Sequence, residues 1–204
     1  MSRSVILSGA RTPFGKLGGE LASKTAVELG SIAAAAAIDR ARLTPEAIEH
    51  TIFGQVLQGG AGQNPARQVM FATGVPKTST AETINRVCGS GMRAITLADS
   101  LIRLDEQDVV LAGGMESMSN APYLLRKARS GYRMGDGVLE DMLMGDGLIC
   151  AVEQVHMGIH AGNVAEEEAL SREAQDAFAL RSHQRAIAAT DSGRFAEEIV
   201  PVDI

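Results

Sequence analysis

Short apolar runs alternate with capped helical segments over the first 114 residues, and this alternation restricts the fold more than any other feature. Strands are expected over residues 5–8, 51–55, 80–87 and 108–114. Helices are expected over residues 25–42, 64–72 and 89–104. The first helix opens with a capping box, because Thr25 stands three residues before Glu28. Strands separated by helices build parallel sheets from βαβ units, so the pattern predicts an α/β fold.

The pattern changes near Ser119. Residues 120–160 are rich in Gly, Met and charge, and they show no clean period. Beyond them Ser171 is expected to cap a long helix, and the last residues of the chain resemble a strand with nothing after them to pair with. We therefore divide the chain into a sheet domain, residues 1–119, and a second region, residues 120–204.

Composition excludes several classes of protein. Hydrophobic residues make up 45% of the chain and the net charge is −6, which argues against a nucleic-acid-binding surface. The longest apolar run, Ile32–Ile38, is far shorter than the ~20 residues of a membrane span, so no membrane partner is expected. The two cysteines are too few for a disulfide framework, which favours a cytoplasmic location.

Two segments resemble a nucleotide-binding motif and a zinc-binding motif, but neither matches its motif fully. Gly9 and Gly15, before Lys16, are separated by five residues where a phosphate-binding P-loop has four. His156 and His160 have the spacing of two zinc ligands on a helix, but Met157 stands where the metalloprotease motif has Glu. We therefore expect no bound metal.

Cys88 is the residue most indicative of chemistry. It lies where a strand is expected to end and a helix to begin, in the segment Asn85-Arg-Val-Cys-Gly-Ser-Gly91. A helix N-terminus carries unpaired N–H groups and partial positive charge, which favour a negatively charged sulfur and can hold the oxyanion formed when a thioester is attacked. On spacing alone, the alternative is that Cys88 is a small buried apolar residue at a tight junction.

The segment around Cys88 resembles the nucleophile motif N-x-x-C-x-S-G of the thiolase family. Further segments resemble thiolase segments in the same order: Ala10–Lys16, Gly62–Gln68, Ala112–Ser119, His156–Gly158, Ser171–Phe178 and Gly193–Ile199. The resemblance covers essentially the whole chain and is closest to the biosynthetic-type acetyl-CoA acetyltransferases. It implies a thiolase-like fold in which residues 1–119 form an N-terminal domain without its last strand. Residues 120–204 would form part of an inserted loop domain, and the C-terminal half would be absent.

The resemblance also implies an activity. Thiolases transfer acyl groups between coenzyme A thioesters, joining two acetyl-CoA into acetoacetyl-CoA and CoA, or running the reverse thiolysis. Cys88 would be the catalytic nucleophile that becomes a thioester, and His156 and Met157 would contact the substrate. No metal or redox cofactor is implied, because acetyl-CoA or another acyl-CoA is itself the substrate. The full-length protein would be a homo-oligomer, a dimer or a tetramer.

The chain departs from the family in its length, which is about half that of a thiolase. The family's catalytic His and second catalytic Cys lie in G-H-P and C-x-G-G-G segments, and neither segment occurs here. Cys150 lies in an apolar segment and is expected to be an inert packed thiol. Two alternatives therefore stay open: a 3-ketoacyl-CoA thiolase of longer-chain fatty acid degradation, and a non-catalytic truncated or binding subunit.

A basic cluster, Arg126, Lys127, Arg129 and Arg133, also allows more than one interpretation. It is typical of a solvated loop. It could equally attract the phosphates of coenzyme A or contact a neighbouring subunit.

Overall fold

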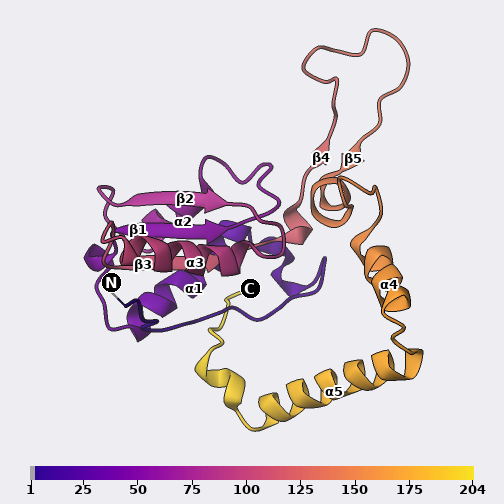
Figure 1. Ribbon diagram of the computed structural model, residues 1–204. Helices are drawn as coiled ribbons and strands as arrows, with labels where there is room; N and C mark the ends of the chain where they lie inside the picture. Colours follow the sequence, from indigo (N-terminus) through magenta and orange to yellow (C-terminus); the bar gives the residue numbers. More distant parts are fainter. Residues whose placement is uncertain (1–2) are drawn as a thin grey trace.

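The computed structural model describes residues 3–204 and confirms the parallel sheet (Figure 1). Strand β1 (His50–Gly54) lies between β2 (Thr80–Ile84) and β3 (Val110–Gly114), and it pairs with both in parallel. The last residues of the three strands are in register. All three strands therefore end at one edge of the sheet.

Helices cover both faces of this sheet. Helices α1 (Ala26–Arg40) and α2 (Pro65–Ala72) pack on one face, around Met70 and Phe53. Helix α3 (Ser90–Arg103) packs on the other face, against Ile52. Because successive residues of a strand point to opposite faces, the neighbours Ile52 and Phe53 belong to different core clusters.

Local capping chemistry sets where the longer helices begin. The Thr25 hydroxyl accepts a hydrogen bond from the Glu28 N–H, and the Glu28 carboxylate accepts one from the Thr25 N–H, which confirms the predicted capping box. Ser171 caps α5 (Arg172–Asp191) in the predicted way, since its hydroxyl accepts from the N–H of Ala174. After Thr44 the chain forms a single 3₁₀ turn, Pro45–Ala47.

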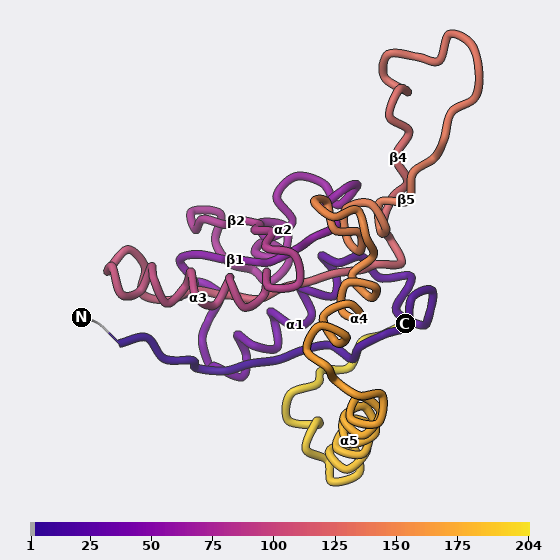
Figure 2. The backbone as a smooth tube through the Cα atoms, turned by 45° about the vertical axis from the view of Figure 1, so that its right-hand side comes forward, coloured from indigo at the N-terminus to yellow at the C-terminus, as the bar shows by residue number. Residues whose placement is uncertain are grey.

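The remaining chain swings away from the sheet and returns (Figures 1 and 2). Its elements are the antiparallel pair β4 (Tyr123–Leu124) and β5 (Glu140–Asp141), a π-helical turn (Leu143–Leu148), α4 (Met157–Glu167) and α5. Short 3₁₀ turns occur at Glu20–Ser23, Met118–Asn120 and Arg194–Glu197. Neither α4 nor α5 has a buried residue. The division at residue 119 stays a prediction.

The buried strand expected at residues 5–8 is wrong. The segment is extended but pairs with no strand, and Val5, Ile6 and Leu7 are 69%, 82% and 58% exposed. The apolar run has the composition of a buried strand, but no other part of residues 3–204 supplies a partner strand for it. Side-chain bonds hold it instead, from Ser4 to Asp99 and from Ser8 to the carbonyl of Ala37.

The end of the chain is fastened to the end of this N-terminal segment. The Arg11 N–H donates to the Glu198 carbonyl at 2.9 Å, and the Val200 N–H donates to the Arg11 carbonyl at 2.9 Å. Arg40 of α1 donates to the carbonyls of Gly9 and Glu198. The strand-like end of the chain thus does have a pairing partner, at one isolated bridge. Among residues 3–204, no helix combines the length and apolarity needed to cross a membrane.

Candidate active site

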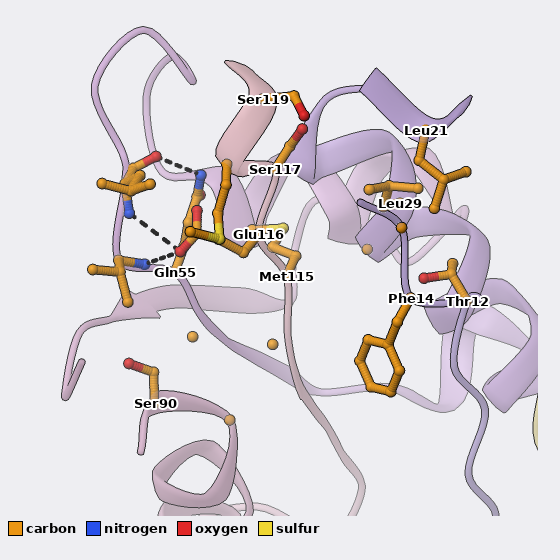
Figure 3. A pocket seen from close by; sticks show the side chains of 18 of the residues that line it. Thr12, Phe14, Leu21, Leu29, Gln55, Ser90, Met115, Glu116, Ser117 and Ser119 are labelled. Carbon is orange, nitrogen blue, oxygen red and sulfur yellow. Dashed lines mark hydrogen bonds between the residues drawn. The ribbon is translucent and has the colours of Figure 1, made fainter. Parts of the chain in front are cut away.

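A pocket of about 580 Å³ opens where the strands of the sheet end (Figure 3). The last residues of β1 and β3, Gly54 and Gly114, contribute to its floor, and the segment 10–17 forms one wall. Cys88 lies in the lining as well. Ligands of open α/β sheets bind outside the carboxyl ends of the strands, so this pocket stands where a functional site is expected.

Much of the pocket wall is apolar. Leu21, Leu29 and Met115 line it, and Phe14 lines it with a ring that is 90% exposed. Figure 3 shows Phe14 and the two leucines across the pocket from Gln55 and Glu116. Such a wall suits an apolar group better than a charged one.

Cys88 lies in the predicted place, between the end of β2 and the start of α3. It is an exposed free thiol, two residues before Ser90, the first residue of the helix, and Gly89 is the N-cap. The alternative of a buried apolar Cys88 is therefore wrong, because Cys88 is exposed and lines the pocket. The helix N-terminus places partial positive charge close to the sulfur.

Glycines bring the start of α3 directly onto the strand ends. A Cβ atom added to Gly54 would lie 2.5 Å from the Ser90 Cβ and 2.7 Å from the Ser90 carbonyl carbon. A Cβ atom added to Gly114 would lie 3.3 Å from the Gly91 Cα. Larger residues at these positions would push the helix away, so the glycines fix the position of the Cys88 loop against the sheet.

The loop before Cys88 is strained. Val87 has a φ of 50°, in the left-handed region that a β-branched residue very rarely adopts. Its N–H donates to the Asn85 side-chain oxygen at 2.8 Å. Strain of this kind is retained where surrounding contacts enforce it, and it gathers at functional sites.

Glu116 and Gln55 are site residues that the sequence prediction missed. One carboxylate oxygen of Glu116 accepts hydrogen bonds from the N–H groups of Val56 (2.8 Å) and Leu57 (3.3 Å), and Gln55 donates to the Leu57 carbonyl. These bonds, drawn in Figure 3, fix the loop after β1 on the pocket side. Gln55 directly follows Gly54, the last residue of β1, and Glu116 stands two residues after Gly114, the last residue of β3. Their place after the carboxyl ends of strands is the signal that could have identified them.

The predicted substrate-binding residues are not in the lining of this pocket. His156 is half-buried and is the N-cap of α4, where its Nδ1 accepts from the Gly158 N–H at 3.0 Å. Met157, the first residue of α4, is 43% exposed. Their contact with a substrate stays a prediction. Cys150 is half-buried and also lies outside the lining.

The basic cluster lies in the excursion between β4 and β5. Its four side chains are exposed, and none of them lines the pocket that contains Cys88. Arg126 pairs with Glu140 at 2.7 Å, and this hydrogen bond lowers the pKa of the Glu140 carboxyl. Among residues 3–204, no group of His, Cys, Asp and Glu side chains is arranged to hold a metal ion.

Comparison with known proteins gives a consistent result. A family model for the N-terminal domain of thiolase matches residues 4–204. The acetyl-CoA acetyltransferase of Escherichia coli is 48% identical over 205 aligned residues, which cover all of this chain and 52% of that protein. The acetyl-CoA acetyltransferase of Cupriavidus necator is 50% identical over 202 residues, covering 99% of this chain and 51% of that protein.

A solved structure agrees with these relatives. The thiolase of Ascaris suum, solved in complex with coenzyme A, superposes with a TM-score of 0.92 at 42% identity. The superposition covers 97% of this chain and 51% of that one. The chain thus spans about half the length of the curated relatives it matches. With a family match over nearly all of its residues and the thiolase fold, the chain belongs to the thiolase family.

Proposed function

We propose that this chain carries the acyl-accepting step of an acetyl-CoA acetyltransferase, with Cys88 as the nucleophile. The observation that carries the proposal is the exposed Cys88 thiol on the wall of an apolar pocket, beside the N-terminus of α3. Relatives about half identical to the chain are named acetyl-CoA acetyltransferases, which supports acetyl-CoA as the substrate.

The first step is a substitution at a thioester. The Cys88 sulfur loses its proton and attacks the carbonyl carbon of acetyl-CoA. A bond forms between that carbon and the Cys88 sulfur, the bond to the coenzyme A sulfur breaks, and coenzyme A leaves as a thiolate that takes up a proton. The step is balanced without an oxidant, a reductant or a metal, so the proposal includes no cofactor.

The second step needs groups that these 204 residues do not contain. A base must remove a proton from the α-carbon of a second acetyl-CoA. The resulting carbanion attacks the acetyl carbonyl carbon, the bond from that carbon to the Cys88 sulfur breaks, and acetoacetyl-CoA leaves while the Cys88 thiolate takes back a proton. The resemblance assigns the proton removal to a second Cys in a C-x-G-G-G segment. It assigns the holding of the nucleophile and part of the oxyanion stabilisation to a His in a G-H-P segment. Neither segment occurs here. We therefore propose complete turnover only in the presence of those segments.

The finer parts of the proposal concern binding and surroundings. His156 and Met157 are proposed to contact the acyl-CoA, in keeping with the complex of the Ascaris suum relative with coenzyme A. The complete enzyme is proposed to be a homo-oligomer in the cytoplasm. Both cysteines of the chain are free thiols, which supports a reducing compartment.

Intact-mass measurement after incubation with acetyl-CoA tests the proposal. We expect the chain to gain the mass of one acetyl group, and Cys88→Ser to abolish the gain. Cys150→Ser is the matched control, because it removes the other thiol away from the pocket, and it should leave the adduct unchanged.

The same measurement separates the alternatives. Labelling by hexanoyl-CoA at a higher rate than by acetyl-CoA would favour a thiolase for longer acyl chains. If no adduct forms, and a thiol reagent labels Cys88 no faster than Cys150, the chain is a non-catalytic subunit and the proposal is wrong.

A further inference from the structure

The strained residue next to the nucleophile is held from both sides. Val87 has a positive φ of 50°, and its N–H is bonded to Asn85. Its carbonyl accepts a hydrogen bond from the Ser90 N–H at 3.1 Å. A β-branched residue leaves this conformation when its restraints are removed, because the left-handed region is unfavourable for it.

The Ser90 hydroxyl bridges two backbone groups of the loop, the Arg86 N–H and the Val87 carbonyl. The Arg86 N–H donates to the Ser90 Oγ at 2.8 Å, and the same hydroxyl donates to the Val87 carbonyl at 2.6 Å. Ser90 is only 4% exposed, so water competes little for these bonds. One side chain thus ties residues 86 and 87 to the first residue of α3.

This bonding is not that of a helix cap. An N-cap side chain accepts from the N–H two or three residues further along the helix. Ser90 is already the first helical residue, and its hydroxyl bonds backward to the loop, while the N-cap Gly89 has no side chain to offer. The hydroxyl therefore orders the loop that carries Cys88 and adds no capping bond to the helix.

The surrounding packing admits little more than a serine here. The Ser90 Cβ lies against β1, so closely that a Cβ added to Gly54 would be 2.5 Å away. A small side chain with both a donor and an acceptor meets these demands together.

We propose that Ser90 is a positioning residue for Cys88, an inference that rests on the proposed function of Cys88. By holding Val87 in its strained conformation, Ser90 keeps the thiol on the pocket wall and near the positive end of α3. Without the hydroxyl, Val87 relaxes and the sulfur turns away from the helix N-terminus.

Alkylation by iodoacetamide tests this without acetyl-CoA, with Cys150 as the reference thiol in the same molecule. Because favourable placement at a helix end changes the energy of a charge modestly, Ser90→Ala should slow Cys88 alkylation about 2–5-fold while Cys150 is unaffected. Ser100→Ala is the matched control: it removes an exposed hydroxyl of α3 that bonds to the Thr96 carbonyl, and it should change neither rate. Equal Cys88 rates in Ser90→Ala and the unaltered chain would overturn the inference.

A second background separates positioning from general destabilisation. Asn adopts positive φ far more readily than Val, so Val87→Asn relieves the strain that Ser90 is proposed to hold. Ser90→Ala should then reduce Cys88 alkylation less than half as much in the Val87→Asn background as in the unaltered one. A crystal structure of Ser90→Ala should show residue 87 at negative φ.

Failure of a variant to fold, or to be acetylated, also tests the role of Ser90. If Ser90→Ala does not fold, the double variant with Val87→Asn should, and failure of both would show that Ser90 serves packing alone. An undiminished effect in the Val87→Asn background would likewise contradict positioning. Absence of acetylation with the expected alkylation pattern would reject the proposed function and retain the role of Ser90 in the loop.

Discussion

The sheet domain and the returning region, residues 120–204, differ in how much side chain they bury. In the first, Ile52 and Met70 are fully buried. In the second, helices α4 and α5 bury nothing, and Phe178 of α5 is 65% exposed. Most of the stability of helices in proteins comes from packing one face of the helix. The stability of α4 and α5 must therefore depend on contacts outside these helices far more than that of the helices on the sheet.

The residues proposed for the chemistry are divided between these two regions. The loop with Cys88 rests on the packed sheet, where glycines and the Ser90 hydroxyl determine its geometry. His156 and Met157, the proposed substrate contacts, stand at the start of α4, which contains no buried residue. We infer that the nucleophile is built into the sheet domain, whereas the substrate contacts depend on what α4 packs against.

The largest expected effect is that of removing a core side chain from the sheet domain. Met70→Ala leaves a cavity between α2 and the sheet and should lower the free energy of unfolding by about 2–5 kcal/mol. Leu180→Ala, the matched change on exposed α5, should change it by no more than about 0.5 kcal/mol. Urea unfolding followed by circular dichroism measures both, and similar losses would show that α5 packs as tightly as the sheet domain.

Gly→Ala substitutions should lower the stability in the sheet domain and raise it in the returning region. Gly54→Ala forces a Cβ against the backbone of Ser90, so it should destabilise by about 1–3 kcal/mol and slow alkylation of Cys88. Gly162→Ala, in α4 with no atom within 4 Å of the added Cβ, should stabilise that helix by about 0.5–1 kcal/mol. Thermal unfolding gives the signs, and a neutral Gly54→Ala would refute the close approach of α3 to β1.

Helix caps should give smaller effects than Met70→Ala and Gly54→Ala. Thr25→Ala should reduce stability by about 1 kcal/mol, because α1 folds with the core. Ser171→Ala should lower the free energy of global unfolding by less than Thr25→Ala does, because α5 contains no buried residue.

Part of the Thr25 effect should depend on pH. The Thr25 backbone N–H and, after it, the Thr25 hydroxyl donate hydrogen bonds to the Glu28 carboxylate and lower its pKa. Thr25→Ala removes only the part due to the hydroxyl, which is present above the unfolded pKa of about 4.3 and is lost as the pH falls through the lower folded value. The stability difference between Thr25→Ala and the unaltered chain should therefore narrow below about pH 4. A difference that widens in acid would contradict the capping box.

Features with a local cause could be predicted from the sequence. The capping box at Thr25, the serine cap at Ser171 and the helix after Cys88 all depend on residues a few positions apart, and all are confirmed. The parallel sheet follows from the alternation of strands and helices in the same way.

Features that depend on distant partners could not be predicted. The apolar residues 5–8 read as a buried strand, but burial requires a neighbouring strand that residues 3–204 do not provide. The positive φ of Val87 could not be predicted either, although Asn85 and Ser90 lie close in sequence, because it opposes the preference of valine and only the bonds made by these two residues reveal it. The Glu116 carboxylate accepts a hydrogen bond from the Val56 N–H, sixty residues earlier in the chain, and no local sequence pattern predicts this contact.

The central claim is that Cys88 accepts an acyl group from coenzyme A and returns it. The most direct measurement is peptide mapping of the acetylated chain, followed by discharge of the adduct with free coenzyme A. We expect acetyl on the Cys88 peptide alone, and faster discharge by coenzyme A than by dithiothreitol at equal concentration. Acetyl spread over Cys88 and Cys150, discharged equally by both thiols, would contradict it.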